Sequence, residues 1–138
     1  MTVEEQIVEL NSEVKCHIKP SKIDGVGVFA LRDIKKDEKL YLVPNRAVKW
    51  YSLKYEDLDK LQPEIRTIIL ARWPSIILGS LFRSPNDDCL LASFVNHGGD
   101  NSNYEQNTDC ATRDIKCGEE ILEDYRTMRR YKEIYPWI

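Results

Sequence analysis

The stretch that decides the fold is Phe94-Val95-Asn96-His97-Gly98-Gly99, followed after a polar loop by Gly118-Glu119-Glu120-Ile121-Leu122-Glu123-Asp124-Tyr125. An Asn-His pair that closes an apolar run, and a Gly-Glu-Glu run that ends in Asp-Tyr, fit poorly to a purely structural segment. Together they place an amide, an imidazole and a phenol in a small chain that has no evident nucleophile triad. The combination indicates a site that positions a cofactor and a cationic substrate, rather than a site that attacks covalently.

Length and composition favour one folded domain. The chain has 138 residues and 42% hydrophobic residues, which is enough to bury a core. Its net charge of −3 argues against general nucleic-acid binding through a phosphate-neutralising face. The acidic balance is compatible with a basic substrate.

The sequence predicts an intracellular protein, cytoplasmic or nuclear. No signal peptide is recognisable in residues 1–10, and no apolar run approaches the ~20 residues of a membrane span. The cysteines show neither a Cys-x-x-Cys pair nor a companion histidine spacing, so no metal site is expected. They are interpreted as reduced thiols, with two disulfides as the alternative. The four positions are Cys16, Cys89, Cys110 and Cys117.

The pattern along the chain predicts an acidic N-terminal helical extension over residues 1–13, followed by one domain over residues 14–138. The extension is expected to be loosely attached, with a weak apolar face made by Val3, Ile7, Val8 and Leu10. Short strands are expected at 14–18, 26–31 and 40–43, the last ended by Pro44. Turns are expected at 24–25 and 35–38.

Residues 52–73 form the clearest helical region. Ser52 is the expected cap, and Pro63 suits the first turn of a second helix. Residues 84–88 are expected to form an exposed loop. One buried stripe is predicted from residues at helical spacing, namely Leu61, Ile65, Ile68 and Ile69.

A short internal repeat is visible. Residues 30–35, Ala-Leu-Arg-Asp-Ile-Lys, recur as Ala-Thr-Arg-Asp-Ile-Lys at 111–116, and each copy continues through a turn into Glu and an apolar residue. We expect two equivalent strand–turn–strand units with Arg and Asp outward and Ala and Ile inward. Two related small sheets flanking a helical insertion fit this pattern better than a solenoid.

Three features could carry chemistry, and each also has a structural interpretation. Gly25-x-Gly27 allows close backbone approach to a ligand, or forms a plain hairpin turn. Asn96-His97 aims polar side chains into a cavity, or caps the end of a helix. Tyr125 takes part in a site, or simply packs. His17 has no obvious partner and is interpreted as a surface or strand residue.

In their order along the chain, these three motifs resemble the SET-domain family of S-adenosylmethionine-dependent protein lysine methyltransferases. The resemblance runs from about Val14 to Tyr125, with residues 45–88 as the family's variable insertion. It implies a mostly β fold, the β-clip, with several small sheets and a helical insertion, in a compact form without a cysteine-rich post-SET zinc segment. It also implies a threaded near-knot in the C-terminal part, where the last motif passes through the Asn-His loop.

By this resemblance, Tyr125 would be the catalytic tyrosine at the inner mouth of a lysine channel. Residues 126–138 would form a lid over the cofactor, with Trp137 as a contact. The implied substrate is a lysine-containing protein or peptide, histones included, without nucleic-acid, membrane or metal partners; the oligomeric state stays open. S-adenosylmethionine, with S-adenosylhomocysteine as product, would lie against Gly25, Val26, Gly27, Asn96 and His97.

The chain departs from the family pattern at positions that matter for activity. Gly98 replaces the usual Ser after Asn-His, and Asn103 matches a later Asn only if one extra residue is allowed. Glu123 stands two residues before Tyr125, where the family has an apolar or aromatic channel residue. Its carboxylate could hold a protonated substrate lysine, or point away in a non-catalytic SET-like module that binds a cofactor or partner. A small β-rich interaction protein with accidental motif matches is the remaining alternative.

Overall fold

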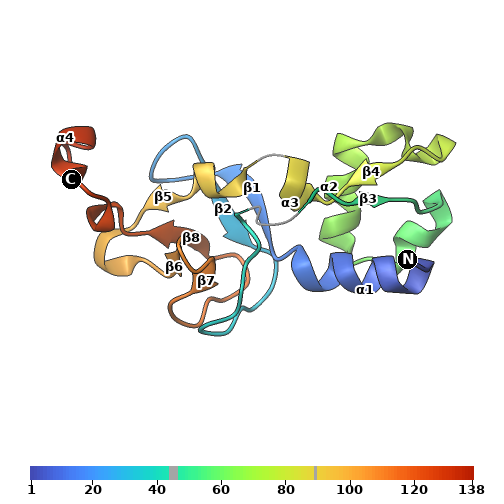
Figure 1. The fold of residues 1–138 in the computed structure, drawn as a ribbon, viewed down its shortest axis with the longest axis horizontal. Coiled ribbons are helices and arrows are strands. Elements are labelled where there is room, and N and C mark those ends of the chain that lie inside the picture. The colour runs from blue at the N-terminus through green and yellow to red at the C-terminus, as the bar shows by residue number, and fades with distance from the viewer. Residues whose placement is uncertain (44–46, 89) are drawn as a thin grey trace.

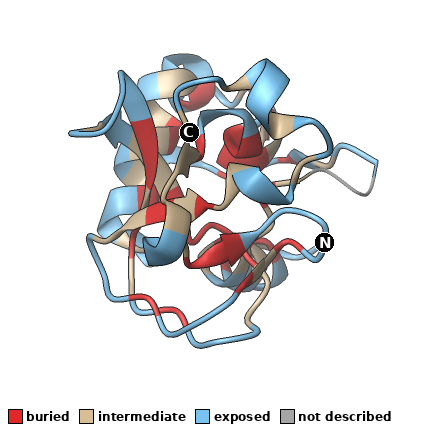
Figure 2. Cartoon of the chain, turned by 90° about the vertical axis from the view of Figure 1, so that its left-hand side faces the viewer, coloured by how far each residue is buried: buried red, intermediate tan, exposed pale blue. Residues whose placement is uncertain are grey.

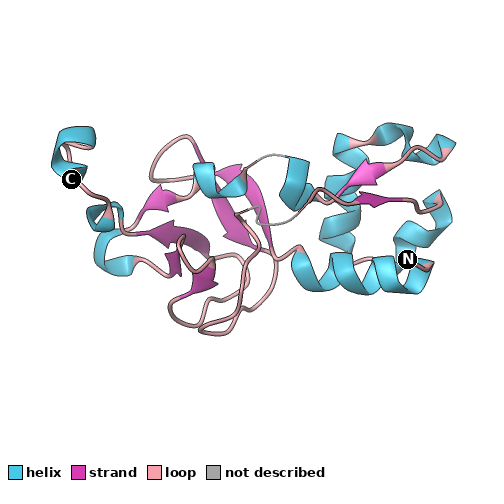
Figure 3. Cartoon of the chain, viewed as in Figure 1, coloured by secondary structure: helices cyan, strands magenta, loops and turns pink. Residues whose placement is uncertain are grey.

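The computed structural model describes residues 1–43, 47–88 and 90–138 (Figure 1). A sheet-rich half and a helix-rich half lie side by side along the long axis of the molecule (Figures 1 and 3). The strands are β1 (Cys16–Pro20), β2 (Val26–Ala30), β3 (Trp50–Tyr51), β4 (Phe82–Arg83), β5 (Asn96–His97), β6 (Tyr104–Glu105), β7 (Cys110–Ala111) and β8 (Glu120–Glu123). The α-helices are α1 (Val3–Glu13), α2 (Pro63–Arg72), α3 (Pro85–Asp88) and α4 (Tyr131–Ile134), and the 3-10 helices are η1 (Tyr55–Lys60), η2 (Pro74–Leu78), η3 (Leu91–Phe94), η4 (Gly99–Asn101) and η5 (Tyr125–Thr127).

The main sheet has the strand order β1-β2-β8-β5, and β3-β4 and β6-β7 form two smaller sheets. Strands β1, β2 and β8 pair antiparallel, whereas β5 pairs with β8 in parallel, with Asn96 opposite Leu122 and His97 opposite Glu123. This confirms the predicted β fold of several small sheets. The near-knot stays a prediction. The parallel pair positions the functional site, because it sets the Asn-His strand beside the last strand.

The two sequence repeats pair with each other. The backbone N–H of Ile34 donates to Ile115 O, and the N–H of Ile115 donates to Ile34 O, both at 2.8 Å. The Asp33 carboxylate accepts the N–H of Cys117 at 2.8 Å, and the equivalent Asp114 accepts the N–H of Lys36 at 2.9 Å. The repeats are therefore two halves of one locally symmetric unit, and the expectation of two separate sheets flanking the insertion is wrong.

Each half has its own core. Figure 2 shows buried residues along the strands of the main sheet and exposed residues in the outer loops. The core of the helix-rich half joins α1 to the insertion, so α1 is not loosely attached: Leu10 is 1% exposed, whereas Val8, expected on the same apolar face, is 67% exposed. The sheet core contains Val28, Ala30, Ile34, Leu40, Val95, Ala111, Ile115 and Ile121, and the second core contains Ile7, Leu10, Tyr51, Leu58, Leu61, Ile65, Ile69 and Phe82.

Three local predictions are wrong. Residues 40–43 form no strand, because Tyr41 takes a left-handed backbone with φ 59° and Leu42 N–H donates to the Asp109 side chain at 3.0 Å. The expected exposed loop at 84–88 contains the short helix α3, and Asn86 is buried there because its amide donates to Glu13 O at 2.9 Å. The first helix of the insertion is capped at Lys54 instead of Ser52.

Other details of the insertion follow the sequence. Pro63 is the first residue of α2, Trp73 is its C-cap and Pro74 begins η2. In the described ranges, no helix is long and apolar enough to cross a membrane. The predictions made for Pro44, for the insertion boundary at residue 45 and for the Cys89 thiol lie outside the described residues.

Candidate functional site

Tyr125 lies against the Asn-His strand. The backbone N–H of Tyr125 donates to Nδ1 of His97 at 3.0 Å, and the two ring centroids are 5.2 Å apart. The Tyr125 hydroxyl donates to the carbonyl oxygen of Val95 at 2.5 Å. Residues 96–97 belong to strand β5, so the alternative of a helix C-cap is wrong. Two motifs that are separate in the sequence thus form one side of a common site.

Arg126 forms ion pairs that connect the end of β8 to the glycine loop after His97. Its Nε and Nη2 donate to the two oxygens of Asp124 at 2.9 and 3.0 Å, and Nη2 also donates to Asp100 at 2.8 Å. The guanidinium holds the pKa of Asp124 below its usual value. Asp124 lies 4.0 Å from Nδ1 of His97, but this nitrogen already accepts the Tyr125 N–H, so the pair is not a hydrogen bond.

Asn96 donates hydrogen bonds to both the Gly-x-Gly turn and the last strand, β8. Its Nδ2 donates to the Glu120 carboxylate at 2.9 Å, to Val26 O at 3.1 Å and to Asp24 O at 3.3 Å. The Ser21 hydroxyl, from the other side of the turn, donates to Glu120 at 2.8 Å. The result is a ring of oxygen acceptors around one amide.

Two glycines of the site lie very close to neighbouring side chains. A Cβ on Gly27 would lie 2.4 Å from Oε2 of Glu120 and 3.2 Å from Nδ2 of Asn96. A Cβ on Gly98 would lie 2.6 Å from Cβ of Leu122, so a serine at this position would clash with β8 as it is placed here. This contact gives the departure at Gly98 a packing reason. Gly25 lies in the same turn as Gly27, where its carbonyl accepts the Ser21 N–H at 2.9 Å.

The C-terminal residues place aromatic rings over this site. The Tyr135 ring lies 4.8 Å from that of Tyr125, and the Trp137 ring lies edge-on, 6.3 Å from His97 and 5.6 Å from Tyr135. Trp137 is 69% exposed, so one face of its indole is open to a ligand.

Two cavities that share lining residues lie near Tyr125, and Tyr125 lines the narrower one. The narrower cavity has a volume of about 190 Å³, and its lining includes Ser93, Val95, Tyr125 and Tyr135. The larger cavity has a volume of about 530 Å³ and a mostly polar lining that includes Ser102, Gln106, Asn107, Thr112 and Thr127. Gln106, Glu123 and Met128 line both cavities.

Glu123 points inward. The alternating pattern of β8 places it on the buried face together with Ile121, and it is 9% exposed. Among the described residues no donor hydrogen-bonds its carboxylate, and burial raises its pKa to about 6. Burial, and then the negative charge of Glu123, raise the pKa of Tyr125 to about 12, so this phenol stays protonated at neutral pH.

The site has members that the sequence analysis did not identify. Glu120 belongs to the Gly-Glu-Glu motif, but the sequence analysis gave this residue no role. It accepts hydrogen bonds from Asn96 and Ser21. Asn103 is fully buried and exchanges hydrogen bonds with β8, donating from Nδ2 to Glu120 O and accepting the Leu122 N–H. Asn103 therefore fixes the strand that carries Glu123. From the sequence, Asn103 is only a shifted match to a later Asn of the family pattern, with no role assigned in positioning β8.

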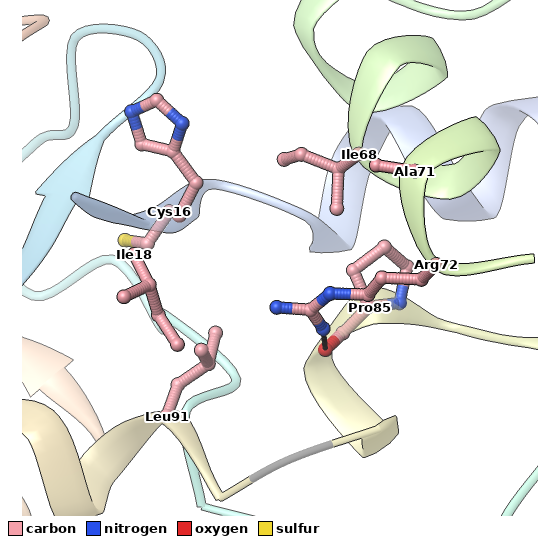
Figure 4. Close-up of a pocket in the computed structure, with 8 residues that line it drawn as sticks. Cys16, Ile18, Ile68, Ala71, Arg72, Pro85 and Leu91 are labelled. Carbon is pink, nitrogen blue, oxygen red and sulfur yellow. Dashed lines mark hydrogen bonds between the residues drawn. The ribbon is translucent and has the colours of Figure 1, made fainter.

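A third cavity, of about 200 Å³, lies between β1 and the helical insertion and shares no lining residue with the two beside Tyr125 (Figure 4). Cys16 and His17 line it from β1. Arg72 lines the opposite side, where it donates to Pro85 O at 3.0 Å (Figure 4). Burial raises the pKa of the Cys16 thiol to about 12, which makes it a poor nucleophile. Cys16, Cys110 and Cys117 are free thiols. In the part of the chain that is described, no three metal-ligating side chains gather.

Comparison with known proteins gives a family. The family model of the SET domain matches residues 25–126, which spans the Gly-x-Gly turn, the insertion, the Asn-His strand and Tyr125. The comparison with curated proteins gave no match. SET domains have the fold of protein lysine methyltransferases.

Proposed function

This chain belongs to the SET-domain family, and we propose that it transfers a methyl group from S-adenosylmethionine to the side-chain amine of a lysine in a protein or peptide. The observation that carries the proposal is the meeting of Tyr125 with the Asn96–His97 strand at the wall of a narrow cavity. It is supported by the ring of acceptors around Asn96 and by the exposed aromatic face of Trp137.

The residues beside Asn96 fit the amino-acid part of S-adenosylmethionine. Carbonyl oxygens of Asp24 and Val26 and the carboxylate of Glu120 suit an ammonium group, and Gly27 leaves backbone exposed where a side chain would fill the space. Rings of His97 and Trp137 offer surfaces for adenine. When bound, the cofactor supplies an electrophilic methyl group on a positively charged sulfur.

Alignment is the main contribution that the protein makes. Direct methyl transfer needs nitrogen, methyl carbon and sulfur in line, and such positioning contributes on the order of 7–11 kcal/mol. Tyr125 donates its only proton to Val95 O, so the lone pairs of the same oxygen are left to accept an N–H of the substrate amine. The raised pKa of this phenol keeps the hydroxyl neutral, which preserves that geometry.

The narrow cavity is the proposed lysine channel. Tyr125 and Tyr135 provide aromatic walls for the methylene chain. Glu123 supplies a carboxylate for the ammonium, and none of the described residues donates a hydrogen bond to it. Both features favour a cationic, lysine-bearing substrate, and histones are one class to test. The identity of the target protein depends on surfaces outside this cavity.

The direct test is methyl transfer from labelled S-adenosylmethionine to a lysine-centred peptide library. We expect transfer by the native protein, loss of at least about 100-fold in Tyr125→Phe, and cofactor affinity that stays within a few fold. Tyr55→Phe is the matched control, because Tyr55 is an exposed tyrosine in the helix-rich half, where its hydroxyl accepts a bond from Arg66. Native-like turnover in Tyr125→Phe would remove this residue from its proposed role.

A second candidate is a non-catalytic module that binds the cofactor or a protein partner. Glu123 favours it, because a carboxylate in the channel stabilises the charged form of lysine, which cannot attack. If the chain is such a module, S-adenosylmethionine should bind and raise the melting temperature of the protein, while no peptide in the library is methylated.

A further inference from the structure

We infer that Glu123 accepts the proton of the substrate ammonium before methyl transfer and releases it to solvent through the larger of the two cavities beside Tyr125. This inference rests on the proposed function. It assigns to Glu123 a catalytic role that is distinct from simple capture of a cation.

The position of Glu123 suits a proton relay. Glu123 lines both cavities. Tyr125 lines only the narrow one, and Ser102, Thr112 and Thr127 line only the larger one. The larger cavity has several polar side chains in its lining and, at about 530 Å³, has room for several water molecules. An amine beside Tyr125 would thus have a carboxylate at its side and a hydrated route beyond it.

The carboxylate is free to take a proton. It is buried on the inner face of β8, and no described residue donates a hydrogen bond to it. Burial disfavours charge on both partners, so it raises the pKa of the carboxyl group and lowers that of a lysine in the same cavity. The pKa of Glu123 is already raised to about 6. A neutral pair therefore becomes accessible where an ion pair would be poorly solvated.

The proton transfer is balanced. The N–H bond of the lysine ammonium breaks, an O–H bond forms on Glu123, and the nitrogen keeps the electron pair. That pair then forms the bond to the methyl carbon while the methyl–sulfur bond breaks, and the electrons of the broken bond stay on sulfur in S-adenosylhomocysteine. Water in the larger cavity takes the proton from Glu123 and restores the carboxylate. The methylated ammonium leaves with its remaining protons.

The titratable groups that face Glu123 from neighbouring elements do not take its place as the proton acceptor. Burial and Asp109 raise the pKa of Tyr104, on β6, well above its usual value, and the pKa of Tyr125 is about 12, so both phenols hold their protons. His97, opposite on β5, uses Nδ1 to accept the Tyr125 N–H. Asp124 is bound by Arg126. Glu105 lines the larger cavity but is exposed.

The test is the pH dependence of kcat for the native protein, Glu123→Gln and a control, with labelled S-adenosylmethionine and the lysine-centred peptide library. The control is Glu56→Gln, at an exposed glutamate of η1 in the helix-rich half. We expect native kcat to fall about tenfold per pH unit below pH 6 and to level off above it. Glu123→Gln should be roughly 100-fold slower at pH 7 and recover to within a few fold by about pH 9.5, where lysine loses its proton without help. Glu56→Gln should follow the native profile.

Recovery at high pH also shows that Glu123→Gln is folded, and circular dichroism at pH 7 checks this independently. If Glu123→Gln raises KM but keeps the native pH profile of kcat, Glu123 only captures the cation and the inference fails while the proposed function stands. If Glu123→Gln is as slow at pH 9.5 as at pH 7 with native circular dichroism, the proton role is also excluded. If the native protein binds the cofactor but methylates nothing at any pH, the proposed function fails as well.

Discussion

The Tyr125 hydroxyl and the Val95 carbonyl oxygen lie 2.5 Å apart, which links the end of the last strand to the residue directly before Asn96. This hydrogen bond and the contact of the Tyr125 N–H with His97 hold the phenol in one orientation. A fixed phenol beside a cavity is what in-line methyl transfer needs, because misplacement by about 1 Å can reduce the rate 100-fold.

Asn96→Ala should weaken S-adenosylmethionine binding by roughly 10- to 100-fold. The substitution removes the amide that joins Glu120 to the Gly-x-Gly turn, so the Val26 carbonyl loses this donor and, among the described residues, the Glu120 carboxylate keeps only its bond from Ser21. Isothermal titration calorimetry measures the effect, with Asn107→Ala, in the exposed loop of the larger cavity, as control. Unchanged affinity in Asn96→Ala would count against a cofactor site at this amide.

Gly27→Ala should destabilise the protein by about 1–3 kcal/mol, because the new Cβ would overlap the Glu120 carboxylate that holds Asn96. Urea denaturation measures the free energy of unfolding. The control is Gly25→Ala, where a Cβ meets nothing within 4 Å and only the left-handed backbone, φ 45°, is strained. A larger loss in the control than in Gly27→Ala would show that the close approach is unimportant.

Glu123→Gln should stabilise the protein at pH 7 by up to about 2 kcal/mol. The folded carboxyl has a pKa of about 6, raised from 4.5, so the folded state binds the proton more tightly than the unfolded state. The contribution of Glu123 to the free energy of unfolding should therefore be most favourable below about pH 4.5. This contribution should be lost as the pH rises from 4.5 to 6.

Urea denaturation of Glu123→Gln and of the native protein at pH 4.5 and pH 7 separates this effect from others. The difference between the two proteins should be larger at pH 7, with Glu105→Gln close to native at both. An equal difference at both pH values would mean that Glu123 is well solvated or paired in the folded state.

Leu10→Ala should reduce the free energy of unfolding by about 2–4 kcal/mol, because Leu10 belongs to the core that joins α1 to the insertion. Val8→Ala, on the exposed side of the same helix, should change it by less than about 0.5 kcal/mol. Denaturation curves compare the two. Similar small losses in both would indicate that α1 is an independent extension.

The sequence predicted those features in which local pattern and tertiary packing agree. Alternation and turn chemistry identified β1 and β2, and the proline at position 63 marked the start of α2. The same alternation, counted from Ile121, indicates that Glu123 points inward, although the sequence alone left both orientations open. The convergence of Tyr125 with Asn96-His97 came from the resemblance, since parallel pairing of β5 with β8 has no local signal.

Predictions were wrong where side chains that are distant in the sequence determine the local backbone conformation. Residues 40–43 have strand-like side chains, but Asp109 binds the Leu42 N–H, so no ladder forms. The segment 84–88 is polar, yet Asn86 is buried because its side-chain amide donates a hydrogen bond to a backbone carbonyl of α1. Glu120 received no role for the same reason, because its partners Asn96 and Ser21 are far away in the chain.

A crystal structure with S-adenosylhomocysteine tests the central claim most directly, namely that Asn96 and Tyr125 serve one pocket. We expect the amino-acid part of the ligand to contact Gly27 and Asn96 and its sulfur to face the Tyr125 hydroxyl. A ligand bound elsewhere, for example in the cavity lined by Cys16 and Arg72, with Asn96 and Tyr125 untouched, would contradict it.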